Sequence, residues 1–114
     1  MASPKMTIPT QLVLRALLEH PTRELYGLEI SRAAGLASGT IHPILARLEG
    51  LGWLESHWEE DVNPAKEGRP RRRYYRLTSD GAERARYALS NAKNPIIGLR
   101  GLTGLRPGLA GGDR

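Results

Sequence analysis

The segment from Lys66 to Arg76 concentrates the positive charge of this chain. It holds six bases and one acid, Glu67, and its net charge of +5 equals that of the whole 114-residue chain. Guanidinium groups bind phosphates through charge-assisted hydrogen bonds, so a cluster of this kind predicts contact with a polyanion. The alternative is a charged loop that only faces solvent. The six bases are Lys66, Arg69, Arg71, Arg72, Arg73 and Arg76.

A second pattern lies on a helix predicted for residues 39–51. Its large apolar side chains gather on one face, which must face the core: Ile41, Ile44, Leu45, Leu48 and Leu51. The opposite face carries small residues, namely Gly39, Pro43, Ala46 and Gly50. Small residues let a helix approach another surface closely, and the major groove of DNA accepts an α-helix. Pro43 predicts that the helix begins near Gly39 or Thr40, or is distorted at its start.

Other chemistry has little support in the sequence. The three histidines, His20, His42 and His57, show no metal-ligand spacing, and there is no cysteine for disulfides or thiolate metal sites. The acidic residues lie mostly on faces predicted to be exposed, and no glycine loop suited to phosphate is present. We therefore expect a protein that is not an enzyme and needs no metal or cofactor.

The expected cellular location follows from the lack of a membrane-spanning stretch and of a signal peptide in this sequence. No stretch approaches 18 apolar residues, and residues 1–9 lack the charged and apolar regions of a signal peptide. The absence of cysteine agrees with a reducing compartment. We expect a cytoplasmic protein.

Three helices are predicted in the first half of the chain. Apolar side chains at helical spacing indicate a first helix at about residues 9–19, with Thr10 as its cap. After a short extended segment at residues 22–25, a second helix is expected at residues 26–34, followed by Gly35 in a left-handed conformation. Ser38 is expected to cap the third helix. Only a few residues separate the second and third helices, which is the spacing of a helix-turn-helix.

The second half predicts a β-hairpin and a last helix. Alternating side chains indicate strands at residues 53–59 and 71–77, and Asn63, Pro64 and Gly68 indicate a long tip between them. The alternation places Arg71 and Arg73 on the face opposite Arg72. A helix follows at about residues 80–91, with Thr78, Ser79 and Asp80 as cap candidates.

These elements predict an α+β fold, a winged helix-turn-helix with three helices, a β-hairpin wing and a C-terminal helix. The expected parts are a flexible N-terminal arm at residues 1–9, a winged-helix domain at residues 10–78 and a C-terminal helix at residues 79–93. Residues 94–114 repeat a Gly-Leu-x unit and hold much of the chain's glycine. Glycine of that density opposes both helix and packed strand, so we expect a disordered tail.

Several stretches also resemble a known family. They are residues 26–30, 38–49, 52–56, 58–60, 68–70 and 73–78, with Gly81. The most specific are Gly39-Thr40-x-x-Pro43 and the strand that runs from Arg73 to Thr78. The chain resembles the PadR-like transcriptional regulators, in a short form without a large C-terminal effector domain. It departs from the usual family pattern at His42, where a tyrosine is common, in the short turn before Ser38 and in its short last helix.

The resemblance implies a bacterial, nucleoid-associated transcription factor, usually a homodimeric repressor on a near-palindromic operator. It implies dimerisation through the first and last helices, where the candidate residues are Leu14, Leu18, Ala85 and Leu89. It also suggests a binding site for a small-molecule effector at the dimer interface, where Trp53 and Trp58 are candidate lining residues.

The candidate contacts with double-stranded DNA come from two elements. The helix at residues 39–51 and its start supply Ser38, Gly39, Thr40, His42, Pro43 and Arg47. The basic wing at residues 66–73 is expected on phosphate or in the minor groove, and it supplies Lys66, Arg69, Arg71, Arg72 and Arg73. Ser38 and Thr40 also fit a capping role, and Arg47 also fits a surface ion pair with Glu49.

Two other functions fit the same patterns. The first is a winged-helix module for protein–protein contact, in which the basic hairpin meets an acidic partner. The second is a nucleic-acid binder without sequence preference. Retention on DNA at moderate salt separates the first alternative from a sequence-specific regulator, and competition by unrelated DNA separates the second.

Overall fold

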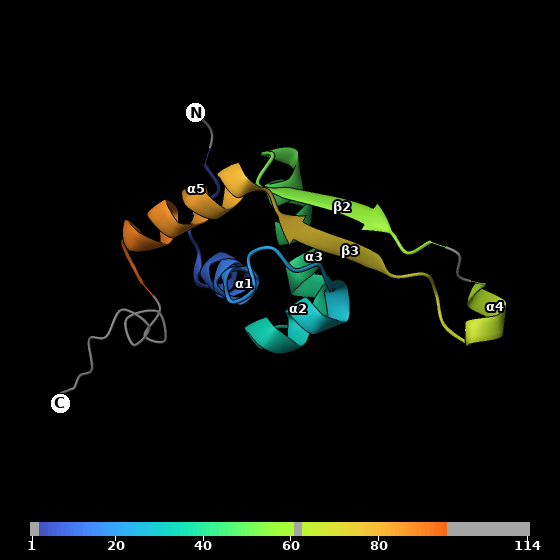
Figure 1. Ribbon diagram of the computed structural model, residues 1–114. Helices are drawn as coiled ribbons and strands as arrows, with labels where there is room; N and C mark the ends of the chain where they lie inside the picture. The colour runs from blue at the N-terminus through green and yellow to red at the C-terminus, as the bar shows by residue number, and fades with distance from the viewer. Residues whose placement is uncertain (1–2, 61–62, 96–114) are drawn as a thin grey trace.

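The computed structural model describes residues 3–60 and 63–95. Helices α1, α2 and α3 pack together on one side of a small sheet, and the ribbon of β2 and β3 extends away from them to α4 (Figure 1). Helix α5 follows at the other end of the ribbon (Figure 1). The elements are α1 (Ile8–Leu18), β1 (Leu25–Tyr26), α2 (Gly27–Ala34), α3 (Ser38–Gly50), β2 (Leu54–Trp58), α4 (Pro64–Glu67), β3 (Arg73–Leu77) and α5 (Ser79–Ser90).

The sheet has three antiparallel strands in the order β1-β3-β2. On its inner face, Leu54 pairs with Leu77 and Ser56 pairs with Tyr75. These positions continue the core formed by α1, α2, α3 and α5, in which Leu14, Ile30, Ile41, Leu45 and Leu48 are fully buried. Three helices, a hairpin wing and a further helix confirm the predicted α+β winged helix-turn-helix.

The cap of α1 is Thr7, and the prediction of Thr10 is wrong. The Thr7 hydroxyl accepts a hydrogen bond from the Thr10 backbone N–H at 3.3 Å. Helix α1 therefore begins at Ile8, and Pro9 falls in its first turn, where a missing N–H costs nothing. Inside the core, the buried Gln11 donates its Nε2 to the carbonyls of Met6 at 3.0 Å and Asn94 at 2.9 Å, which joins the start of α1 to the segment after α5.

The cap of α3 is Ala37, and the prediction of Ser38 is wrong. The Ala37 carbonyl accepts from the N–H groups of Thr40 and Ile41, at 2.9 and 3.2 Å, while no side chain caps the helix. Ser38 is thus the first helical residue. Pro43 lies beyond the first turn and has no N–H for the carbonyl of Gly39, so the helix lacks one bond there.

The other boundaries differ by one to three residues from those predicted. Gly35 ends α2 with φ of 71°, as expected for a left-handed C-terminal glycine. The short extended segment lies at Leu25–Tyr26, and β3 begins at Arg73, two residues later than predicted. The four-residue helix α4 lies in the predicted loop. From residue 96 onward, the predicted tail lies outside the described residues.

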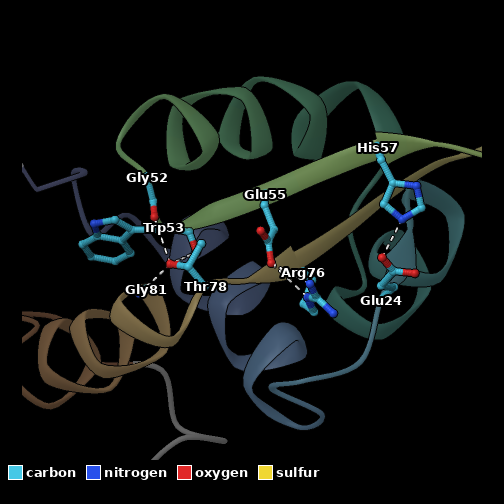
Figure 2. Close-up of polar contacts among 8 residues, drawn as sticks. All are labelled: Glu24, Gly52, Trp53, Glu55, His57, Arg76, Thr78 and Gly81. Carbon is cyan, nitrogen blue, oxygen red and sulfur yellow. Dashed lines mark hydrogen bonds and ion pairs between the residues drawn. The ribbon is translucent and has the colours of Figure 1, made fainter.

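Thr78, one of the predicted cap candidates, joins α5 to the start of the wing. Its hydroxyl accepts from the Gly81 N–H at 2.9 Å and donates to the Gly52 carbonyl at 2.9 Å (Figure 2). Its own N–H donates to the Trp53 carbonyl at 3.0 Å. Because Gly81 has no side chain, the first turn of α5 lies directly against the backbone of Trp53.

Candidate nucleic-acid interface

The small-residue face of α3 is exposed along the whole helix. Gly39, Pro43, Ala46 and Gly50 are all exposed. No heavy atom of a neighbouring residue lies within 4 Å of where a Cβ on Gly39 or Gly50 would stand. The helix therefore presents its backbone on a surface of low relief, which suits close approach to a groove.

The predicted polar contacts at the start of α3 are exposed as well. Ser38, Thr40 and His42 all face solvent. The His42 ring lies beside the first residue of α2, because its Cε1 is 3.4 Å from where a Cβ on Gly27 would stand. The start of α2 and the His42 ring on α3 are therefore within van der Waals contact of each other.

Arg47 is exposed and remains available for an external anion. It forms no ion pair within residues 3–60 and 63–95, so the alternative of a pair with Glu49 is not realised. Glu49 instead accepts from the Ser56 hydroxyl at 2.5 Å and lies 3.7 Å from Nη2 of Arg73. These two contacts join α3 to the hairpin.

The wing, residues 54–77, is organised around Glu59. The guanidinium of Arg69 donates to both carboxylate oxygens of Glu59, with Nη1 to Oε1 at 2.9 Å and Nη2 to Oε2 at 3.1 Å. Arg71 donates from Nε and Nη2 to the Glu59 carbonyl, at 3.1 and 2.8 Å. The backbone of Arg72 exchanges two further bonds with Glu59: its N–H donates to Oε1 at 3.1 Å, and its carbonyl accepts from the Glu59 N–H at 2.7 Å.

Glu59 is absent from the residues predicted above because its partners lie 10 to 13 positions away along the chain. Counting charge within residues 66–76 treats the arginines as free cations. The available signal is the hairpin itself, since an acid just after β2 must lie opposite the residues just before β3.

Arg72 and Arg73 lie on opposite faces of the sheet, as predicted. The Arg72 guanidinium carbon is 4.2 Å from the centre of the Tyr26 ring. The Arg73 guanidinium carbon is 5.1 Å from the centre of the half-exposed Trp58 ring, on the side of Glu49. Lys66 on α4 is exposed and forms no ion pair in the described part of the chain. The five predicted wing cations therefore do not form one uniform surface.

The hydrogen bonds from Arg69, followed by the backbone bond from Arg72, lower the pKa of Glu59 from 4.5 to about 2. Since the folded value lies below the ordinary one, ionised Glu59 stabilises the wing above pH 4.5, and this contribution is lost as the pH falls toward 2. We expect the carboxyl carbon of Glu59 to titrate near pH 2 by NMR, and Arg69→Ala to raise the pKa toward 4.5. A wild-type pKa near 4.5 would contradict the paired geometry.

His57 and Glu24 link the two edges of the sheet across its outer face. Nε2 of His57 lies 2.5 Å from the Glu24 carboxylate (Figure 2). Nδ1 lies 3.1 Å from the Trp58 carbonyl. Both ring nitrogens face acceptors, which favours the doubly protonated ring, and the Glu24 bond is the main cause that raises the pKa of His57. The ring also stacks on Tyr74 of β3, with centroids 5.8 Å apart. These contacts hold β2 in place relative to β1.

The predicted dimerisation residues lie mainly inside one chain. Leu14, Ala85 and Leu89 are buried where α1 contacts α5, and Leu18 is half-buried. The same two helices expose other apolar side chains, of which Tyr87 is 73% exposed and Ile8 is 43% exposed.

Two further features bear on the class of protein. Among residues 3–60 and 63–95, no group of three histidine, cysteine, aspartate or glutamate side chains is arranged to hold a metal ion. None of the helices described is long and apolar enough to cross a membrane.

Known proteins of similar sequence and structure agree with this architecture. A family model described as the transcriptional regulator PadR-like family matches residues 13–87. A PadR family transcription regulator from Clostridium difficile R20291 has a similar structure, with a TM-score of 0.56 and 23% identity over 71% of this chain and 82% of that one. No curated protein shows significant sequence similarity to this chain.

Two solved structures are similar to this chain over just over half of their own length. The PcaV transcriptional regulator from Streptomyces coelicolor, in complex with its natural ligand, is 29% identical over 75% of this chain and 55% of its own, with a TM-score of 0.57. Overoxidized AbfR bound to DNA is 25% identical over 75% of this chain and 56% of its own, with a TM-score of 0.58.

The helix-turn-helix, the exposed face of α3 and the basic hairpin define a winged-helix transcriptional regulator. Because the family model spans residues 13–87 of 114, the chain belongs to the PadR-like family of transcriptional regulators. Proteins of this family are DNA-binding regulators and not enzymes, which confirms the expectation from the sequence that this protein is not an enzyme.

Proposed function

We propose that this regulator is a homodimeric repressor that binds a near-palindromic operator in the bacterial cytoplasm. The observation that carries the proposal is the exposed small-residue face of α3, which lies on the same domain as a wing whose basic segment holds the chain's net charge of +5. The likeness to AbfR bound to DNA supports the same use of the fold.

In this proposal, α3 enters the major groove and its first residues contact base edges. Thr40 and His42 read sequence, because they are exposed beside the small-residue face. Arg47 contacts phosphate. On the wing, Lys66 and Arg71 make the strongest phosphate contacts, since both are exposed and neither is paired with a described acid.

A second copy of the chain would pack on the exposed side of α1 and α5. Tyr87 and Ile8 are the apolar side chains available there, while Leu14 and Leu89 support the helices from inside. Dimerisation would place two copies of α3 about one turn of DNA apart, which matches a palindromic site. The PcaV complex with its natural ligand supports a small-molecule effector between subunits as a further part of the proposal.

Removing single wing cations tests the phosphate contacts. We expect Lys66→Ala and Arg71→Ala each to weaken binding to all DNA sequences similarly and to lower the slope of log K against log salt by about 0.9. Thr40→Ala and His42→Ala should instead change which sequences bind best. The measurement is fluorescence anisotropy on specific and unrelated duplexes between 50 and 300 mM salt, roughly the range in which the slope is well defined. Unchanged slopes for both wing variants would contradict the assignment.

A further inference from the structure

We propose that Glu59 is a positioning residue, an acid that shapes the basic wing for binding DNA. The inference rests on the proposed function, because it assigns Glu59 a part in the wing's contact with phosphate. Its side chain is 16% exposed, and three arginines of the basic segment contact this residue: Arg69, Arg71 and Arg72. By charge alone, an acid on a surface that binds a polyanion is expected to weaken the binding, because it repels the phosphates.

The contacts of Glu59 fix three arginines in three different ways. Its carboxylate holds the guanidinium of Arg69, its carbonyl holds the guanidinium of Arg71, and its backbone and side chain together hold the backbone of Arg72. Glu59 thereby determines the path of the segment that precedes β3, from Arg69 to Arg72. It also determines the direction in which two of the arginine side chains point.

The two guanidinium groups differ in the charge that they present. Arg69 donates to a carboxylate, so this pair is nearly neutral as seen from outside. Arg71 donates to a carbonyl, which orients the group without cancelling its charge, and the residue is exposed. The carboxylate of Glu59 therefore neutralises Arg69, while Arg71 remains an oriented cation that can bind phosphate.

Orientation before binding has a direct effect on affinity. A free arginine loses rotamer entropy when it is fixed on a phosphate, and each immobilised long side chain costs about 0.5 to 1.5 kcal/mol. Because Arg71 and Arg69 are already held, part of that ordering is complete in the free protein. Substitution of Glu59 keeps the carbonyl but removes the carboxylate bonds to Arg69 and to the Arg72 N–H, which bring Arg71 to that carbonyl. The substitution should therefore weaken binding to DNA, even though it removes a negative charge.

The test compares two adjacent acids with opposite expected results. Glu60 is exposed and makes no hydrogen bond or ion pair with the described residues, so Glu60→Ala removes the same charge without disturbing the wing. We expect Glu59→Ala to weaken DNA binding by about three- to tenfold, and Glu60→Ala to leave it equal or tighter. The Glu59→Gln variant keeps an acceptor for the Arg72 N–H and should fall between wild type and Glu59→Ala.

A second readout does not depend on DNA. In the wild-type protein, the backbone N–H of Arg72 donates to the Glu59 carboxylate and should be protected from hydrogen exchange, which NMR measures. We expect Glu59→Ala to remove this protection and to lower Tm only modestly, because the core lies away from the tip. Glu59→Gln, which changes little besides charge, keeps the comparison valid if the alanine variant folds poorly.

The outcomes separate this inference from the proposed function. If wild type binds DNA and both Glu59 variants bind it as tightly or more tightly, the positioning role is wrong. If no variant binds DNA, including wild type, the proposed function fails, and the protection of the Arg72 N–H then decides whether Glu59 organises the wing. Loss of protection supports that role, and unchanged protection in Glu59→Ala overturns it.

Discussion

Gly81→Ala is expected to destabilise the protein by roughly 3 kcal/mol or more, at the upper end of single substitutions. A Cβ at this position would lie 2.1 Å from the Trp53 carbonyl oxygen and 2.7 Å from both its Cα and its carbonyl carbon. All three are backbone atoms, so no side-chain rotation relieves the clash. The first turn of α5 would have to move away from Trp53 and break the Thr78 bonds to Gly52 and Gly81 (Figure 2).

Thermal unfolding followed by circular dichroism measures this effect. In a domain of this size, each kcal/mol shifts Tm by about 4 to 8 °C, so a fall of more than ~10 °C is expected. The matched control is Gly50→Ala, which also adds a methyl group to a helical glycine but meets no atom within 4 Å. It should leave Tm unchanged or slightly higher, because alanine favours helix. Equal Tm values for the two variants would show that α5 does not lie against Trp53.

Ala46→Glu is expected to abolish binding to DNA while the fold is retained. Ala46 lies exposed in the middle of the small-residue face, and glutamate is a good helix former. A carboxylate there would meet the phosphates and bases at close range, and juxtaposed like charges cost several kcal/mol, which corresponds to about a 100-fold loss or more. Fluorescence anisotropy titration with a specific duplex measures this loss of DNA affinity.

The control for Ala46→Glu adds the same charge on another helix. Ser79 is exposed at the start of α5, away from Tyr87, and Ser79→Glu changes the net charge by the same amount. We expect at most a small loss of DNA affinity for this variant. Equal losses for the two variants would mean that net charge, and not the face of α3, governs binding.

The periodicity of the sequence predicts the faces of the elements well. Residues such as Leu45 and Ala46 are adjacent, yet one is buried and the other exposed, as helical spacing requires. Capping residues are harder to predict than faces. Thr7 and Thr10 have the same chemistry as caps, and only the position of Pro9 within the first turn favours the earlier start of α1. The four residues of α4 are too few to show a period.

Contacts between distant residues could not be predicted from spacing alone. Apolar periodicity shows that Leu14 and Leu89 are covered, but not whether their own chain or a second chain covers them. The close approach of Gly81 to Trp53 depends on how α5 packs against the start of β2. Likewise, charge counting marks the wing as basic but leaves out Glu59, which holds its arginines in place.

In the proposed function, α3 and the wing recognise a specific DNA sequence. The most direct test is a titration of the purified protein on the DNA upstream of its own gene, with unrelated DNA of equal length as competitor, followed by footprinting. We expect a site that resists competition, with two protected half-sites about one helical turn apart. Equal competition by unrelated DNA would contradict sequence-specific binding and leave a nucleic-acid binder without sequence preference. No binding to either DNA would favour a protein partner for the same surface.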